Sequence, residues 1–167
     1  MNSTTTDNIK EIAEQLDCGF RAFIHKTTGQ LLFVPDENNL TEIDLDPWDE
    51  ELEQLENNFT DYYEIDKWTS REAFEIMSEF ADQVSDNNLQ SRLFDALRKN
   101  KPFREFKFVI DNSDDFRQQW FDFKNKWQQD LVARQLNRLK PTDKDERIRK
   151  PQLPTSVAVA QLHFFEL

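Results

Sequence analysis

Residues 94–124 read FDALRKNKPFREFKFVIDNSDDFRQQWFDFK, and this stretch places aromatic side chains at helical spacing with basic residues beside them. Pro102 suits the first turn of a short helix. The apolar seam of that helix is Phe103, Phe106, Val109 and Ile110. After a turn at Asn112-Ser113, a longer helix carries an apolar stripe of Phe116, Trp120, Phe123, Trp127 and Leu131. The spacing predicts two helices that bury aromatic rings, and it identifies no chemistry.

Two further helices are predicted just before this stretch. Thr69 and Glu72 form a capping box, which marks a helix start. The helix that follows has acidic residues on its far side, and its inward residues are Ala73, Met77, Phe80 and Val84. The next helix covers residues 88–98, and its inward residues are Leu89, Leu93, Ala96 and Leu97. The second half of the chain is therefore expected to be helical.

The first half of the chain predicts a helix and a small sheet. A helix over residues 7–16 should end at Gly19. Strand-like runs over 20–25 and 30–34 flank a turn in which Gly29 supplies a positive φ. The elements expected next are a short helix with Trp48, Leu52 and Leu55 on its apolar side, and a third strand over 59–65.

The composition favours one folded domain with an aromatic core. The 167 residues include 15 Phe, 4 Trp and 2 Tyr, and such rings bury on the order of 150–250 Å² each. We expect a single α+β domain over residues 1–139, in which a small antiparallel sheet of two or three strands packs on four to five helices. Residues 140–167 form a basic, proline-containing tail that is either disordered or docked as a short strand.

Glycine and cysteine are too scarce for several classes of site. Two glycines exclude phosphate-binding loops, dinucleotide fingerprints and nucleophile elbows, which need glycines at fixed offsets. A single cysteine, Cys18, excludes an intramolecular disulfide and a cysteine zinc cluster, and we expect it to be buried at a helix end. His25 is typical of a polar strand-edge residue rather than a base. We therefore predict no catalytic residue, no metal site and no cofactor, and an enzyme is the less favoured class.

The chain has no sequence signal for a membrane. No run approaches the roughly 18 apolar residues of a membrane span, and the N-terminus lacks the apolar segment of a signal peptide. With one cysteine, the chain suits a reducing compartment, so we expect a cytoplasmic protein. The oligomeric state stays open.

The net charge of −12 is spread unevenly along the chain. Residues 1–100 carry 23 acidic and 8 basic side chains, whereas residues 101–167 carry 10 acidic and 13 basic ones. This charge disfavours nucleic acid as a partner, because phosphate contacts dominate such binding. Nucleic-acid binding stays an alternative for the basic end of the chain, where the candidate contacts are Arg134, Arg138, Lys140, Arg147, Arg149 and Lys150.

Three phenylalanines, Phe94, Phe108 and Phe121, lie roughly 140° from the apolar stripes of their own helices. They either pack on the sheet and neighbouring helices or form an exposed patch that binds a partner. The basic residues beside the two aromatic seams are Lys101, Arg104, Lys107, Arg117 and Lys124. These cations either pair with the acidic first half or form a ledge that holds a phosphate, a nucleic acid or an acidic peptide.

Residues 36–56 contain 10 acidic side chains and no basic one. The densest carboxylates are Asp44, Asp46, Asp49, Glu50 and Glu51. Pro47 and Trp48 stand where a calcium loop needs its central glycine, so the segment does not fit that template. A solvated acidic face is the favoured interpretation, and a metal-dependent hydrolase that uses carboxylates is a further alternative.

The central segments of the chain resemble a known family. Its pattern is matched by Tyr62 to Ile65, Ser70-Arg71-Glu72, Leu93 to Leu97, Pro102 to Lys107 and Trp120 to Phe123. Over about residues 20–135 the chain is similar to the bacterial proteins grouped as uncharacterised protein family 0158. The resemblance implies a bacterial cytoplasmic protein, and it brings no function that can be transferred.

These observations favour a non-enzymatic protein-interaction or regulatory module with a protein as its partner. The aromatic and basic residues gather in one part of the sequence, and no catalytic signature competes with them. The predicted binding residues are Arg104, Lys107, Phe108, Arg117, Phe121 and Lys124.

Overall fold

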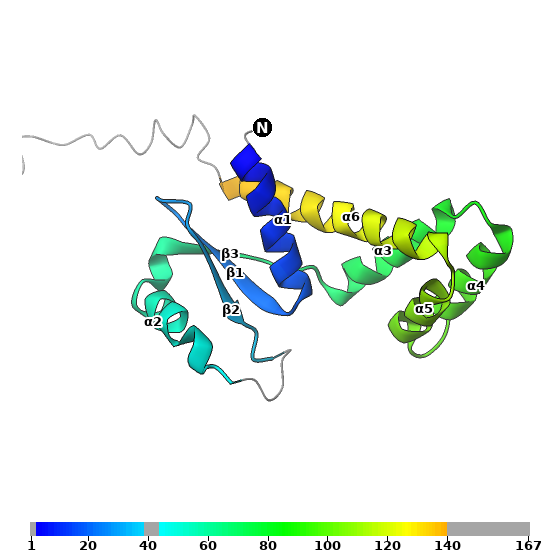
Figure 1. The fold of residues 1–167 in the computed structure, drawn as a ribbon, viewed down its shortest axis with the longest axis horizontal. Helices are drawn as coiled ribbons and strands as arrows, with labels where there is room; N and C mark the ends of the chain where they lie inside the picture. Colours follow the sequence, from blue (N-terminus) through cyan, green and yellow to red (C-terminus); the bar gives the residue numbers. More distant parts are fainter. Residues whose placement is uncertain (1–2, 39–43, 140–167) are drawn as a thin grey trace, which may run out of the picture. The chain divides into compact units, whose positions relative to one another are not determined.

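A computed structural model of the protein describes residues 3–38 and 44–139, and these residues form an α+β fold (Figure 1). The expectation for the tail, residues 140–167, lies outside the described residues. In chain order the elements are α1 (Ser3–Asp17), β1 (Phe20–His25), β2 (Leu31–Pro35), the 3₁₀ turn η1 (Asp46–Trp48), α2 (Asp49–Asn57), the 3₁₀ turn η2 (Phe59–Asp61), β3 (Tyr62–Ile65), α3 (Ser70–Gln83), α4 (Asn87–Leu97), α5 (Pro102–Asp111) and α6 (Asp115–Leu139).

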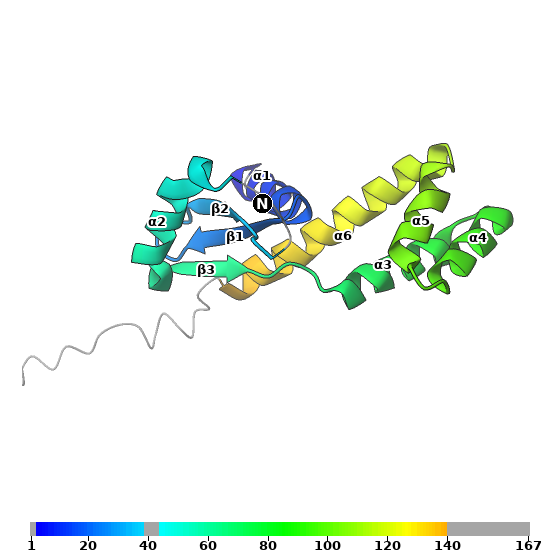
Figure 2. The same ribbon diagram turned by 90° about the horizontal axis from the view of Figure 1, so that it is seen from below.

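The three strands form one antiparallel sheet in the order β2-β1-β3, and Figure 2 shows β1 between its two neighbours. The predicted hairpin is confirmed, because Gly29 has a φ of +71° and His25 N donates to Gln30 O at 2.8 Å across the turn. The third strand begins at Tyr62 rather than at Phe59. Residues 59–61 form η2 instead, and Phe59 is exposed there.

Helices α1 and α2 supply apolar residues next to the sheet. The buried stripe of α1 is Ile9, Ile12, Ala13 and Leu16. The helix ends at Asp17, and Gly19, the predicted stop, follows with a φ of +92°. Leu55 of α2, with Leu52 partly buried beside it, packs against a cluster of strand residues, which are Phe23, Leu32, Val34 and Tyr62. The sheet therefore has its own small core.

The expectation that Cys18 is buried is wrong, because its side chain is exposed. The buried stripe of α1 ends at Leu16, two residues earlier. Two residues correspond to about 200° around a helix, so the position of Cys18 no longer faces the core.

Helices α3 to α6 build a second, larger core with aromatic residues around it. The buried members of this core are Met77, Phe80, Ala81, Val84, Leu89, Leu93, Ala96, Leu97, Phe106, Val109 and Ile110. Trp120 of α6 packs its ring 5.3 Å from that of Phe80 and 4.9 Å from that of Phe106. The predicted inward residues of α4 are all buried, and the capping box of Thr69 and Glu72 is present at the start of α3.

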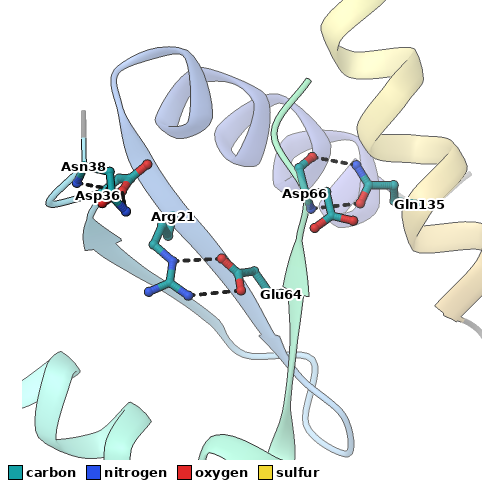
Figure 3. A network of polar contacts seen from close by, with 6 residues as sticks. All are labelled: Arg21, Asp36, Asn38, Glu64, Asp66 and Gln135. Carbon is teal, nitrogen blue, oxygen red and sulfur yellow. Dashed lines mark hydrogen bonds and ion pairs between the residues drawn. The ribbon is translucent and has the colours of Figure 1, made fainter. Parts of the chain in front are cut away.

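Long helix α6 also contacts residues of the first half of the chain. Asp17 at the end of α1 accepts hydrogen bonds from Lys124 Nζ and from Gln128 Nε2, both at 2.9 Å. Gln128 is the buried polar residue of this helix, and its bond to Asp17 satisfies it. Further along the helix, the Gln135 side chain bonds the main chain of Asp66, just after β3 (Figure 3).

Candidate functional site

Helix α5 has one buried side and one exposed side. Phe106, Val109 and Ile110 are buried, which turns the remaining long side chains of the helix outward. We call four of these the α5 face: Phe103, Arg104, Lys107 and Phe108. The prediction that Phe103 belongs to the buried seam is wrong, because 45% of its surface is exposed. It lies in the first turn of α5, next to Pro102, at the margin of the buried side.

Phe108 is the most exposed large apolar residue among those described, with 65% of its surface accessible. Beside it, Arg104 Nη2 lies 3.7 Å from Glu105 Oε1, and Lys107 Nζ lies 2.9 Å from Asp111 Oδ2. Both cations are mostly exposed, so their pairs are of the weak surface kind. The α5 face therefore presents two rings and two cations that solvent reaches.

Asp111 joins α5 to the start of α6. Lys107 Nζ contacts one of its oxygens, and Arg117 Nε lies 3.3 Å from the other, Oδ1. The hydrogen bond from Lys107, and then the one from Arg117, lower the pKa of the Asp111 carboxyl below its ordinary value. Asp111 was not among the predicted site residues. Its i,i+4 spacing from Lys107 is the signal that could have identified it.

On α6, Phe121 lies between two cations. The guanidinium of Arg117 is 4.7 Å from the centre of its ring, and Lys124 Nζ is 5.7 Å away. Lys124 also pairs with Asp17 at 2.9 Å. Of the predicted ledge, Lys124 is thus paired with the acidic first half of the chain, whereas the acidic neighbours of Arg104, Lys107 and Arg117 lie on α5.

The structure therefore connects four of the six predicted residues through shared contacts. Lys107 reaches Arg117 through Asp111, and Arg117 and Lys124 share the ring of Phe121. Arg104 and Phe108 lie on the same exposed side of α5 as Lys107. Phe94, the third ring off its stripe, is partly buried against the helical core and adds nothing to this surface.

The side chain of His25 contacts the main chain of the hairpin turn. Its Nδ1 accepts hydrogen bonds from the main-chain N–H groups of Thr27 and Thr28, both at 3.2 Å. The ring also lies edge-on to Tyr62, with 5.0 Å between ring centres. These contacts fix the acceptor nitrogen within the turn.

The residues of the metal and nucleic-acid alternatives fall partly within the described part of the chain. Within residues 3–38 and 44–139, no group of three or more His, Cys, Asp or Glu side chains could hold a metal ion. Arg134 Nε donates to the carbonyl of Asp130 at 3.3 Å, whereas the candidate phosphate contacts from Lys140 onward lie outside the described residues. No described helix combines the length and apolarity needed to span a bilayer.

The comparisons place the chain in a family. It matches the family described as Uncharacterised protein family (UPF0158) over residues 3–154, which is most of its length, so it belongs to that family. The match extends beyond the resemblance over residues 20–135 in both directions, and it includes part of the segment after Lys140. No curated protein and no solved structure matches the chain.

Proposed function

We propose that this member of Uncharacterised protein family (UPF0158) is an interaction module that binds an acidic segment of a partner protein through the α5 face. The supporting observation is that Phe103 and Phe108 are 45% and 65% exposed on a helix that also exposes Arg104 and Lys107. A single exposed ring is ordinary on a protein surface. Two rings with two cations on one helix face are typical of a binding surface, where aromatic residues and arginine are enriched.

The charges around α5 favour an acidic partner. Residues 98–107 contain the basic side chains Arg98, Lys99, Lys101, Arg104 and Lys107, against one acidic residue, Glu105. The chain as a whole carries −12, so an acidic partner is repelled elsewhere and directed toward this part of the surface.

The cations of the α5 face can exchange their present neighbours for a partner. Exposed pairs such as those of Arg104 and Lys107 contribute about 0–1 kcal/mol each, so replacing Glu105 or Asp111 by a carboxylate of the partner costs little. Lys101 is exposed and has no ion pair among the described residues. The exposed rings would then lose contact with water as the partner covers them.

A pull-down with a matched control tests the proposal. Tagged full-length protein is incubated with an extract of the organism that encodes it, and retained proteins and nucleic acids are identified. The test variants are Arg104→Glu/Lys107→Glu and Phe108→Ser. The control, Arg71→Glu/Lys126→Glu, reverses two other exposed cations, each of which forms an i,i+4 ion pair, with the same change in net charge. Retained partners are then purified, and their affinities for all four proteins are measured.

We expect the wild type and the control variant to bind a partner that both test variants lose. Raising the salt concentration should weaken this binding, because exposed charges are screened. Equal binding by all four proteins would contradict the proposal. Retention of nucleic acid alone, abolished by nuclease, would instead favour the nucleic-acid alternative.

A further inference from the structure

Strand β2 lies at an edge of the sheet, and main-chain hydrogen bonds at its two ends fix which of its residues bond β1. At one end His25 N donates to Gln30 O at 2.8 Å, and at the other Asp36 N donates to Gly19 O at 3.1 Å. In an antiparallel ladder such bonded pairs alternate with non-bonded ones. The even-numbered positions of β2 therefore direct their main-chain groups toward β1.

The odd-numbered positions direct theirs away from the sheet. Leu31 lies opposite Ile24 and Phe33 lies opposite Ala22, and both are non-bonded pairs of the ladder. No hydrogen bond to the outward N–H and C=O groups of Leu31 and Phe33 comes from the described part of the chain. Pro35 is the next outward position, and because it has no N–H, the pairing edge ends there.

A groove of about 500 Å³ lies against this edge, and Leu31 and Phe33 line it. Gln15 of α1 contributes to its wall, as do Trp48 of η1 and Gln54 of α2. The ring of Trp48 lies 5.7 Å from that of Phe20, so an aromatic pair forms part of the surface. This volume is in the range of pockets that hold a small ligand or a short peptide segment.

Two carboxylates also line the groove, those of Glu50 and Glu51 in the first turn of α2. Neither has an ion pair with any described residue, and no basic residue occurs between positions 36 and 56. A cation that enters the groove would meet unneutralised carboxylates beside aromatic rings, a combination that suits lysine and arginine side chains.

At the opposite edge of the sheet, one outward position is already bonded. The main-chain N–H and C=O of Asp66, the residue just after β3, are both bonded by the Gln135 side chain (Figure 3). The edge of β2 has no such cover among the described residues, and long uncovered edges are sites of strand addition.

We propose that this groove binds an extended, basic peptide segment of a partner protein, which adds to β2 as a fourth strand. The main-chain groups of Leu31 and Phe33 bond the peptide, and a lysine or arginine of the peptide lies beside Glu50 and Glu51. Strand addition of this kind takes its affinity from main-chain bonds and its specificity from the pockets beside them. The site is separate from the α5 face and selects the opposite charge.

The probe for this proposal is a blocked pentapeptide of alternating valine and arginine, titrated into the full-length protein and followed by NMR. We expect the Leu31 and Phe33 amides to exchange with solvent about tenfold more slowly near saturation, because they become hydrogen-bonded. The amides of Tyr62 and Glu64 on β3 should not change. The indole N–H signal of Trp48, assigned with Trp48→Phe, should shift.

Modified peptides test the strand geometry. Only one alternating set of peptide N–H groups faces β2 in an added strand. Of two peptides, one N-methylated at its valines and one at its arginines, we expect one to keep its affinity and the other to bind about tenfold or more weakly. Equal affinities of the two methylated peptides would overturn the proposal, as would no binding of the parent peptide at about 1 mM.

Protein variants test the edge and the carboxylates separately. Leu31→Pro removes an N–H that does not bond β1, so the sheet is preserved while peptide affinity should fall about tenfold. Glu50→Gln/Glu51→Gln should weaken binding roughly fivefold, as expected for two partly exposed ion pairs. The matched control is Glu53→Gln/Glu56→Gln, on the same helix but outside the groove lining. The proposal would be overturned if both glutamine variants lost peptide affinity equally and the peptide left the amide exchange rates of Leu31 and Phe33 unchanged.

Discussion

The side-chain amide of Gln135 bonds both main-chain groups of Asp66: Asp66 N donates to Oε1 at 2.9 Å, and Nε2 donates to Asp66 O at 2.8 Å. The two residues are 69 positions apart, so this contact ties the end of α6 to the end of β3. A primary amide matches a peptide group in having one donor and one acceptor side, which is why glutamine fits this position.

Gln135→Glu is expected to destabilise the protein by about 1 kcal/mol, because a carboxylate can accept from Asp66 N but cannot donate to Asp66 O. Urea unfolding measures the change. Gln119→Glu, at an exposed position of the same helix, is the control and should stay within about 0.5 kcal/mol of the wild type. If the two variants are equally stable, the bond to Asp66 contributes nothing.

Asp111→Asn is expected to change how stability depends on pH. In the wild type, the pKa of the Asp111 carboxyl is lowered in the folded protein, chiefly by the hydrogen bond from Lys107. A carboxyl whose pKa is lowered by folding stabilises the fold fully at any pH above its ordinary, unfolded pKa. This contribution is lost as the pH falls through the pKa of the folded state. The wild type should therefore exceed Asp111→Asn in stability above about pH 4, and the two should converge at lower pH.

Urea midpoints of both proteins over a series of pH values measure this difference. The same substitution in a Lys107→Met background is the control, because it removes the main cause of the shift. A constant difference between the two proteins across the acidic range would contradict the assignment of the shift to Asp111.

Features of the fold that depend on local sequence could be predicted. The turn at Gly29, the capping box of Thr69 and Glu72, and the inward residues of α4 each follow from spacings of a few positions, and all are present in the structure. Phe103 shows the limit of such periodicity. A residue at the margin of a buried face is covered only if a neighbouring element extends over it, and none covers Phe103 fully.

Contacts between distant parts of the chain gave no local signal. Lys124 pairs with Asp17 across 107 positions, so part of the predicted ledge is bound to the first half of the chain. Predicting the groove beside β2 requires knowing which residues of β2 bond β1 and where α2 lies. No sequence pattern gives both. Sequence periodicity therefore located the aromatic and basic residues, but it could not say which of them solvent reaches.

Thr69→Ala is expected to destabilise the protein by about 1 kcal/mol, the usual cost of removing a threonine N-cap. Thr69 Oγ1 accepts a hydrogen bond from Glu72 N at 3.2 Å, and the Glu72 carboxylate accepts one from Thr69 N at 2.8 Å. Thr69→Ser keeps both contacts and should cost much less. Thermal or urea unfolding distinguishes them, and equal losses in the two variants would show that the methyl group, not the cap, matters.

Gly29→Ala tests backbone strain alone. A Cβ added at Gly29 meets no atom within 4 Å, so there is no clash to relieve. The positive φ of +71° nevertheless disfavours a residue with a Cβ, at a cost of about 1–2 kcal/mol. Gly29→Asn should cost less, because asparagine tolerates this conformation better. Urea unfolding of both variants measures their free energies of unfolding. Equal stability of Gly29→Ala and the wild type would show that the positive φ of Gly29 causes no strain in alanine.

Phe106 and Phe108 lie two residues apart on α5, and we expect opposite results from replacing them. Phe106 is 1% exposed in the helical core, so Phe106→Ala should cost about 3–5 kcal/mol of stability. Phe108 is 65% exposed, so Phe108→Ala should stay within about 0.5 kcal/mol of the wild type while it weakens partner binding. Chemical unfolding measures stability, and binding is compared with the partner retained in the pull-down. A large loss of stability in Phe108→Ala would assign its ring to the fold rather than to recognition.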